Sequence, residues 1–127
     1  MINVTDDRLY TKEHAWIRRQ GDGRCDVGLS GYAIEAFAGL AYFSFLVKIG
    51  DKVKIGDDLA DIESRKSADT LKCPVNGVVE DFGGMIEKDP SCLEDCDGAT
   101  CILLIKEEGE NKDLMTRKEY DEYVKTL

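Results

Sequence analysis

Long apolar runs are missing from this sequence. No stretch approaches the roughly 20 consecutive apolar residues that cross a bilayer as a helix. The N-terminal residues 1–7 (MINVTDD) have neither the apolar segment of a secretory signal nor the arginines of an organellar transit peptide. We therefore expect a protein of the cytoplasm that binds no membrane, or one of the mitochondrial matrix if a leader has been removed.

Basic residues are also scarce. The sequence has 17 lysines and arginines against 26 aspartates and glutamates, which gives a net charge of −9. Such a surface repels a polyanion, so we expect no nucleic acid partner. The acidity has two interpretations, which are a surface that keeps the protein soluble and a field that steers it toward basic patches on partner enzymes.

Histidine occurs once, as His14, and the five cysteines are an odd number. An odd count without a secretory leader argues against a disulfide framework. Cys92, Cys96 and Cys101 cluster, but their spacing is not that of a zinc knuckle and His14 is distant in sequence. We therefore expect reduced thiols and no metal site. The sequence also has no nucleophile–base pair and no phosphate-binding loop, so we expect no catalytic residues.

Short strand patterns separated by glycine and aspartate dominate the chain. Residues 24–29 alternate polar and apolar side chains, as a half-buried strand does, and form a predicted hairpin with residues 10–19. The aromatic and apolar run 41–47 predicts a buried strand. Further strands are expected at residues 59–64, 69–73, 78–82 and 99–105.

Two helices are expected. Ser30 can cap a short helix that runs through Ala38, and Thr116 with Glu119 forms a capping-box pattern near the C-terminus. The second helix should dock through an apolar stripe made of Tyr120, Tyr123, Val124 and Leu127. Short strands with two small helices predict a mainly β fold, a β-sandwich or flattened barrel, in one domain over residues 1–127.

The stretch 61–77 (DIESRKSADTLKCPVNG) carries the chemical information. It is predicted to form two strands joined by a polar tip that contains Lys66. Such a tip holds one amine away from the core on a rigid support, and the flexible lysine stem ends in a nucleophile once it is deprotonated. Acylation of that amine needs an activated donor and a ligase that recognises the hairpin.

This stretch resembles the lipoyl-lysine hairpin of the glycine cleavage system H-protein family. The family carries Glu-Ser-x-Lys followed by a Ser/Tyr-Pro-Val-x-Gly turn, which correspond here to residues 63–66 (ESRK) and 73–77 (CPVNG). Further family segments are matched in order by residues 10–16 (YTKEHAW), 27–33 (VGLSGYA), 50–56 (GDKVKIG) and 114–120 (LMTRKEY). The resemblance therefore covers essentially the whole chain.

The resemblance implies a lipoyl/biotinyl-type β-sandwich with lipoate attached covalently to Lys66, and Glu63, Ser64 and Asp69 as residues that support the cofactor. H proteins are non-catalytic, monomeric carriers in glycine catabolism. The lipoyl arm accepts an aminomethyl group at glycine decarboxylase and presents it to the aminomethyltransferase. Dihydrolipoyl dehydrogenase then reoxidises the arm, and a lipoate–protein ligase or lipoyl transferase attaches it.

Two substitutions bear on partner choice. Ala15 stands where the family has a glutamate that helps to hold the amine of the loaded arm, whereas Asp69 keeps a second acid. Arg65 stands where the family has a small or apolar residue before the lysine. Two alternatives follow, which are an H-protein-like lipoyl carrier serving another dithiol redox or lipoyl-transfer pathway, and a non-lipoylated interaction module. Lys66 argues against the latter.

Overall fold

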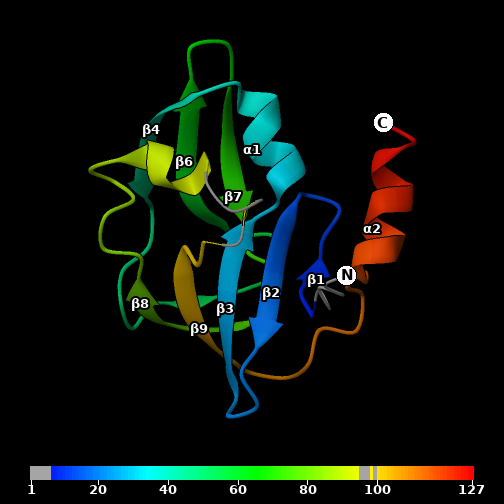
Figure 1. Ribbon diagram of the computed structural model, residues 1–127. Coiled ribbons are helices and arrows are strands. Elements are labelled where there is room, and N and C mark those ends of the chain that lie inside the picture. Colours follow the sequence, from blue (N-terminus) through cyan, green and yellow to red (C-terminus); the bar gives the residue numbers. More distant parts are fainter. Residues whose placement is uncertain (1–6, 95–97, 99) are drawn as a thin grey trace, which may run out of the picture.

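The computed structural model describes residues 7–94, 98 and 100–127, which form two antiparallel sheets and short helices (Figure 1). The larger sheet has the strand order β1-β2-β3-β9-β8-β5 and the smaller one β4-β6-β7. The large sheet contains β1 (Leu9–Tyr10), β2 (Ala15–Arg19), β3 (Arg24–Leu29), β5 (Lys52–Val53), β8 (Gly77–Phe82) and β9 (Leu103–Glu107). The small sheet contains β4 (Leu40–Phe45), β6 (Asp58–Ser64) and β7 (Ala68–Lys72).

The main core is built from the apolar faces of the strands, as alternation along them predicts. In β3, for example, Cys25 and Val27 are fully buried, and β6 contributes Leu59, Ala60 and Ile62. Two neighbours on β6 can both point inward because the β6–β7 register shifts between Asp58 and Ala60. The mainly β fold with two sheets and two short α-helices is therefore confirmed.

The helices sit at the margins of the sheets. Ser30 caps α1 (Gly31–Phe37) by accepting a hydrogen bond from the amide of Ala33 at 3.2 Å. Thr116 and Glu119 form the predicted capping box of α2 (Arg117–Val124). A short 3-10 helix, η1 (Pro90–Glu94), packs near β4. No helix in the described part of the chain is long and apolar enough to cross a membrane.

A second, smaller core attaches α2 to the large sheet. Tyr120 stacks on Tyr10 of β1 with ring centroids 4.5 Å apart, and Trp16 completes this cluster. The predicted stripe is wrong at its end, because the helix stops at Val124 and Leu127 is 63% exposed.

Three predicted strands have different bounds or burial. The run 41–47 was expected to be buried, but in β4 the neighbours Ala41 and Tyr42 are both exposed. The register against β6 shifts between Leu40 and Tyr42, so two consecutive side chains face outward. The last strand begins at Leu103 rather than at residue 99, which lies outside the described residues. The first hairpin arm is broken between Tyr10 and β2 by a turn at which His14 takes a φ of 73°.

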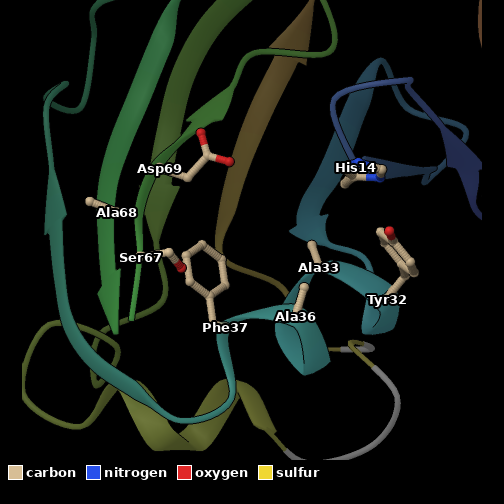
Figure 2. A pocket seen from close by; sticks show the side chains of 8 residues that line it. All are labelled: His14, Tyr32, Ala33, Ala36, Phe37, Ser67, Ala68 and Asp69. Carbon is tan, nitrogen blue, oxygen red and sulfur yellow. The ribbon is translucent and has the colours of Figure 1, made fainter. Parts of the chain in front are cut away.

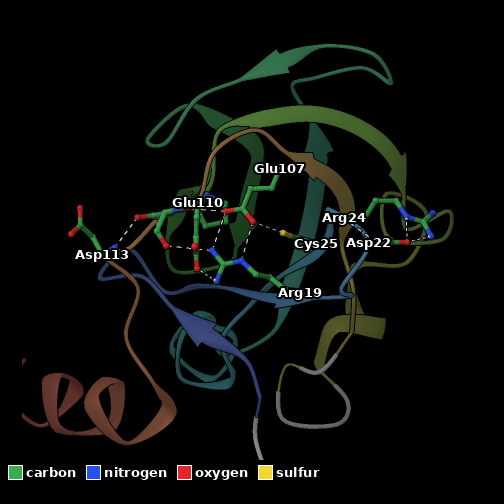
Figure 3. A network of polar contacts seen from close by, with 9 residues as sticks. Arg19, Asp22, Arg24, Cys25, Glu107, Glu110 and Asp113 are labelled. Carbon is green, nitrogen blue, oxygen red and sulfur yellow. Dashed lines mark hydrogen bonds and ion pairs between the residues drawn. The ribbon is translucent and has the colours of Figure 1, made fainter.

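A partly buried ion pair fastens the segment that leads from β9 to α2 (Figure 3). Arg19 donates two hydrogen bonds to Glu107, from Nε at 2.9 Å and Nη2 at 3.0 Å. The same carboxylate accepts the backbone amide of Asn111 at 3.3 Å. The hydrogen bonds from Arg19 lower the pKa of Glu107, so this contact stays ionised at neutral pH. It fixes the path by which the chain carries α2 back to β1.

Candidate functional site

The β6–β7 hairpin ends in the tight turn that carries Lys66. β6 stops at Ser64 and β7 starts at Ala68, and the amide of Ser64 donates to the carbonyl of Ser67 at 2.8 Å. Lys66 is exposed, and in Figure 1 this green hairpin projects from one end of the molecule. The prediction of an exposed Lys66 between two antiparallel strands is confirmed, and its amine is open to a modifying enzyme.

Ser64 organises this turn from inside. Its Oγ accepts hydrogen bonds from the backbone amides of Lys66 at 3.2 Å and Ser67 at 3.1 Å. A serine side chain that bonds to the amides two and three residues ahead pre-sets the turn. Glu63, one residue earlier, is exposed and pairs with Ala68 across the hairpin. The Glu-Ser pair before Lys66 thus ends the strand and shapes the tip.

Substitution of Ser64 by alanine should loosen the tip without unfolding the protein. The loss of two hydrogen bonds at an exposed turn is expected to cost about 0.5–1.5 kcal/mol in the free energy of unfolding. Hydrogen exchange at the amides of Lys66 and Ser67 should accelerate, whereas exchange at Ile62 in the same strand should not. Ser44→Ala on β4 is the matched control. Unchanged exchange at both tip amides in Ser64→Ala would show that the serine does not order the turn.

A groove lies between this hairpin, α1 and the turn before β2 (Figure 2). Its volume is about 250 Å3. We call it the His14–Asp69 groove, and it is lined by His14, Tyr32, Ala33, Ala36, Phe37, Ser67, Ala68 and Asp69. Asp69 of β7 is exposed and lies across the groove from His14. The structure thus places one predicted acidic residue in a groove that begins directly beside Lys66.

His14 faces the groove and does not belong to the main core. Its side chain lines the groove and its Nδ1 lies 2.7 Å from the hydroxyl of Tyr120. Burial lowers the pKa of His14, and the nearby carboxylates of Asp69 and Glu13 act in the opposite direction. The sequence did offer one sign of a role for His14, which is that the single histidine stands two residues before Trp16. Its hydrogen-bond partner Tyr120 is 106 residues away, so no local pattern could predict the contact.

Trp16 is a packing residue. It is fully buried, and its Nε1 donates to the carbonyls of Gly98 at 2.7 Å and Leu29 at 3.2 Å. Its indole covers Gly28, where a Cβ atom would lie only 2.3 Å from the ring. These contacts hold the strand that follows His14.

The expectation for position 15 needs correction. Ala15 was expected to occupy a position beside the arm, but its side chain is fully buried in the main core and is not among the groove-lining residues. The positive φ of His14 turns the chain there, so His14 lines the groove and Ala15 enters the core. A glutamate at position 15 would therefore have to displace core packing before it reached the groove.

A model of the family described as glycine cleavage H-protein matches residues 8–127. The chain belongs to the glycine cleavage H-protein family. A glycine cleavage system H protein of Aquifex aeolicus is 35% identical over 127 residues, covering 98% of this chain and 73% of the relative. A probable glycine cleavage system H protein of Pyrococcus furiosus is 36% identical, covering 98% of this chain and 94% of the relative.

A solved structure agrees with this assignment to the H-protein family. The crystal structure of a glycine cleavage system H protein from Mycobacterium marinum has a TM-score of 0.84 and 26% sequence identity, and the match covers 96% of this chain and 99% of that one. The expected sandwich of the family is therefore confirmed as well. H proteins are the lipoyl-carrier components of the glycine cleavage system.

Three of the described cysteines of this H protein have unreactive thiols. Burial raises the pKa of Cys25 to about 12, and the pKa values of Cys73 and Cys101 to about 11. Such thiols stay protonated at neutral pH and are poor nucleophiles. Cys96, the middle member of the cluster noted in the sequence, lies outside the described residues. Within those residues, no group of three or more metal-ligating side chains is suited to hold an ion.

Proposed function

We propose that this H protein carries lipoate covalently on Lys66 and uses it as a swinging arm for a glycine-derived aminomethyl group. The observation that carries the proposal is the exposed Lys66 at the tip of the β6–β7 hairpin, in a chain that belongs to the H-protein family. A lysine on a short turn between paired strands gives the arm a fixed base. Glu63 and Ser64 shape that base, and Asp69 supports the arm.

The chemistry belongs to the bound cofactors of other proteins, and this chain supplies attachment, orientation and shelter. The partners that we propose are glycine decarboxylase, the aminomethyltransferase, dihydrolipoyl dehydrogenase and a lipoate–protein ligase or lipoyl transferase. We propose that the chain acts as one monomeric, non-catalytic carrier domain in the cytoplasm. The bacterial and archaeal origins of similar H proteins support the cytoplasm as its location.

The His14–Asp69 groove is the resting place that we propose for the loaded arm. Ser67 and Ala68, which follow Lys66 directly, form part of its wall, so an arm on Lys66 needs only to fold back onto its own hairpin. Phe37 and the alanines of α1 offer an apolar surface for the hydrocarbon chain, and the Asp69 carboxylate offers a partner for an ammonium group.

A lipoyl carrier for another dithiol pathway is the second candidate. The replacement of the family glutamate by Ala15 favours it, because one acid that pairs with the amine is absent. The burial of Ala15 and the retention of Asp69 in the groove weigh against it. The two candidates differ in whether the arm must accept an amine, so glycine-dependent chemistry separates them.

The discriminating assay is glycine–bicarbonate exchange with the lipoylated protein and a glycine decarboxylase from the same organism. We expect exchange with the unsubstituted carrier and a decrease of about fivefold with Asp69→Asn. A charge-assisted hydrogen bond contributes about 1.5–3 kcal/mol when it is sheltered, and less at the exposed Asp69 because water reaches it. Asp61→Asn, on the neighbouring strand, is the matched control. If the protein is fully lipoylated but shows no exchange with a competent decarboxylase, the glycine-carrier function is refuted and a carrier for another dithiol pathway is favoured.

A further inference from the structure

A chain of three side chains connects the groove to the C-terminal helix. The hydroxyl of Tyr120 on α2 lies 2.7 Å from His14 Nδ1 and 2.7 Å from the Oγ of Ser30. Ser30 Oγ also accepts the amide of Ala33 at the start of α1. Ser30 and Tyr120 are 1% and 3% exposed, so water does not compete for these hydrogen bonds.

The hydrogen atoms shared by Ser30, Tyr120 and His14 can be assigned by counting donors and acceptors. If Ser30 donates to Tyr120 and Tyr120 donates to His14 Nδ1, every hydroxyl hydrogen has an acceptor. The imidazole proton then sits on Nε2, on the far side of the ring from Nδ1. In the reverse order, Nδ1 donates to Tyr120 and Tyr120 donates to Ser30. The hydrogen of the buried Ser30 hydroxyl is then left without an acceptor among the described residues, which disfavours this order.

We propose that Ser30 and Tyr120 are positioning residues that hold His14 neutral with its proton on Nε2, and that His14 thereby determines which arm end the groove accepts. With His14 uncharged, Asp69 is the only ionised side chain among the described residues that line the groove. The groove then favours a lipoyl arm that ends in a primary ammonium over the uncharged oxidised or reduced arm. This inference rests on the proposed carrier function and names the chemistry that the groove selects.

The other groups around His14 are consistent with a neutral ring. Tyr32 of α1 and Tyr123 of α2 face it as aromatic rings with centroids at 5.0 and 6.5 Å. Two carboxylates, Glu13 and Asp69, favour the charged ring, yet burial outweighs them and the pKa of His14 falls below its usual value. Of the neighbouring cations, the Nζ of Lys12 lies over the Tyr123 ring and Lys72 pairs with Asp58.

Acidification should reverse the direction of the hydrogen bonds between His14, Tyr120 and Ser30. It should thereby change which form of the arm the groove prefers. A protonated His14 carries a hydrogen on Nδ1, so it turns the Tyr120 hydroxyl toward Ser30 and deprives the Ser30 hydrogen of its acceptor. It also places a positive charge across the groove from Asp69, which repels an ammonium and offsets the carboxylate. The preference for an amine-loaded arm should therefore fall as pH falls through the His14 midpoint.

Nitrogen NMR of the imidazole tests whether His14 is neutral with its proton on Nε2. The protein has a single histidine, so the signals are unambiguous. In the unlipoylated protein we expect the Nε2–H tautomer and a titration midpoint below 6.5. Tyr120→Phe keeps the ring that stacks on Tyr10 but removes the hydroxyl, so the midpoint should rise and the tautomer preference should weaken. Tyr123→Phe is the matched control and should change neither.

An Nδ1–H tautomer in the unsubstituted protein would overturn the proposal, even if Tyr120→Phe fails to fold. An unchanged midpoint in a folded Tyr120→Phe would also overturn it, since a role in packing alone predicts that result.

The effect of His14 on arm docking is tested with lipoylated protein. The NMR shifts of the Ala68 and Asp69 amides are compared between the oxidised arm and the arm that the decarboxylase has loaded from glycine. The loaded arm should dock about fivefold better near neutral pH than below the His14 midpoint. His14→Asn, which stays neutral and tolerates a positive φ, should remove this pH dependence. Docking that is independent of pH in the unsubstituted protein would refute the role of His14 but leave the carrier function intact. Failure of lipoylation would instead refute the carrier function and leave the tautomer result standing.

Discussion

Replacement of Lys66 by alanine is expected to abolish lipoyl incorporation and, with it, all glycine–bicarbonate exchange. Lys66 is the only lysine in the Glu-Ser-x-Lys context, and its side chain is exposed at the end of a hairpin. An exposed turn residue contributes little to packing, so the free energy of unfolding should change by no more than about 0.5 kcal/mol. Intact mass after incubation with lipoate and the ligase of the same host measures incorporation.

The matched control for this substitution lies on the same hairpin. Lys72 is at the end of β7, where it pairs with Asp58 on β6. A surface ion pair of this kind is worth about 0–1 kcal/mol, so Lys72→Ala should fold and accept one lipoyl group as before. Incorporation that persists in Lys66→Ala, or that disappears in Lys72→Ala with Lys66 intact, would refute the assignment of the attachment site.

Substitution of Trp16 by alanine should have the largest effect on stability. The indole is fully buried between β1, β3 and α2, and its removal leaves a cavity over Gly28. The carbonyls of Gly98 and Leu29 also lose their donor. Truncation of a buried aromatic side chain costs about 3–5 kcal/mol, a large part of the 5–15 kcal/mol that stabilises a typical domain. Urea unfolding followed by far-ultraviolet circular dichroism measures this without relying on tryptophan fluorescence.

Tyr42→Ala provides the comparison for Trp16. Tyr42 is 48% exposed on an edge strand, so its truncation should cost less than about 1 kcal/mol. If Trp16→Ala destabilises the protein no more than Tyr42→Ala does, then the small core under α2 does not hold the strand next to the groove.

Strand alternation and turn residues predicted most of the fold, because these signals are local. The β2–β3 hairpin, both helix caps and the β6–β7 hairpin each depend on residues a few positions apart. The errors arose where tertiary context decides. The run 41–47 is as apolar as a buried strand, yet β4 exposes Ala41 and Tyr42, where its register against β6 shifts. Leu127 continues the helical spacing but lies beyond the end of α2.

The functional site was also predictable only where it depends on local sequence. Lys66 and its turn were predictable because the motif and the hairpin occupy one short stretch. The groove was not, because it joins His14, α1 and β7, and the hydrogen bond between His14 and Tyr120 spans 106 positions. Ala15 was assigned to the arm from its alignment in a motif, whereas the backbone turn at His14 directs its side chain into the core. Which residue of a motif faces a groove thus depends on a φ angle that the sequence pattern does not reveal.

The most direct test of the carrier function is the mass of the protein purified from its own host, followed by fragmentation of the peptide that contains residue 66. The structure and the family predict one lipoyl group per chain, attached to Lys66, in cells whose other lipoyl proteins are modified. A chain without modification in those cells, or a lipoyl group on any other lysine, would contradict the function proposed for this protein.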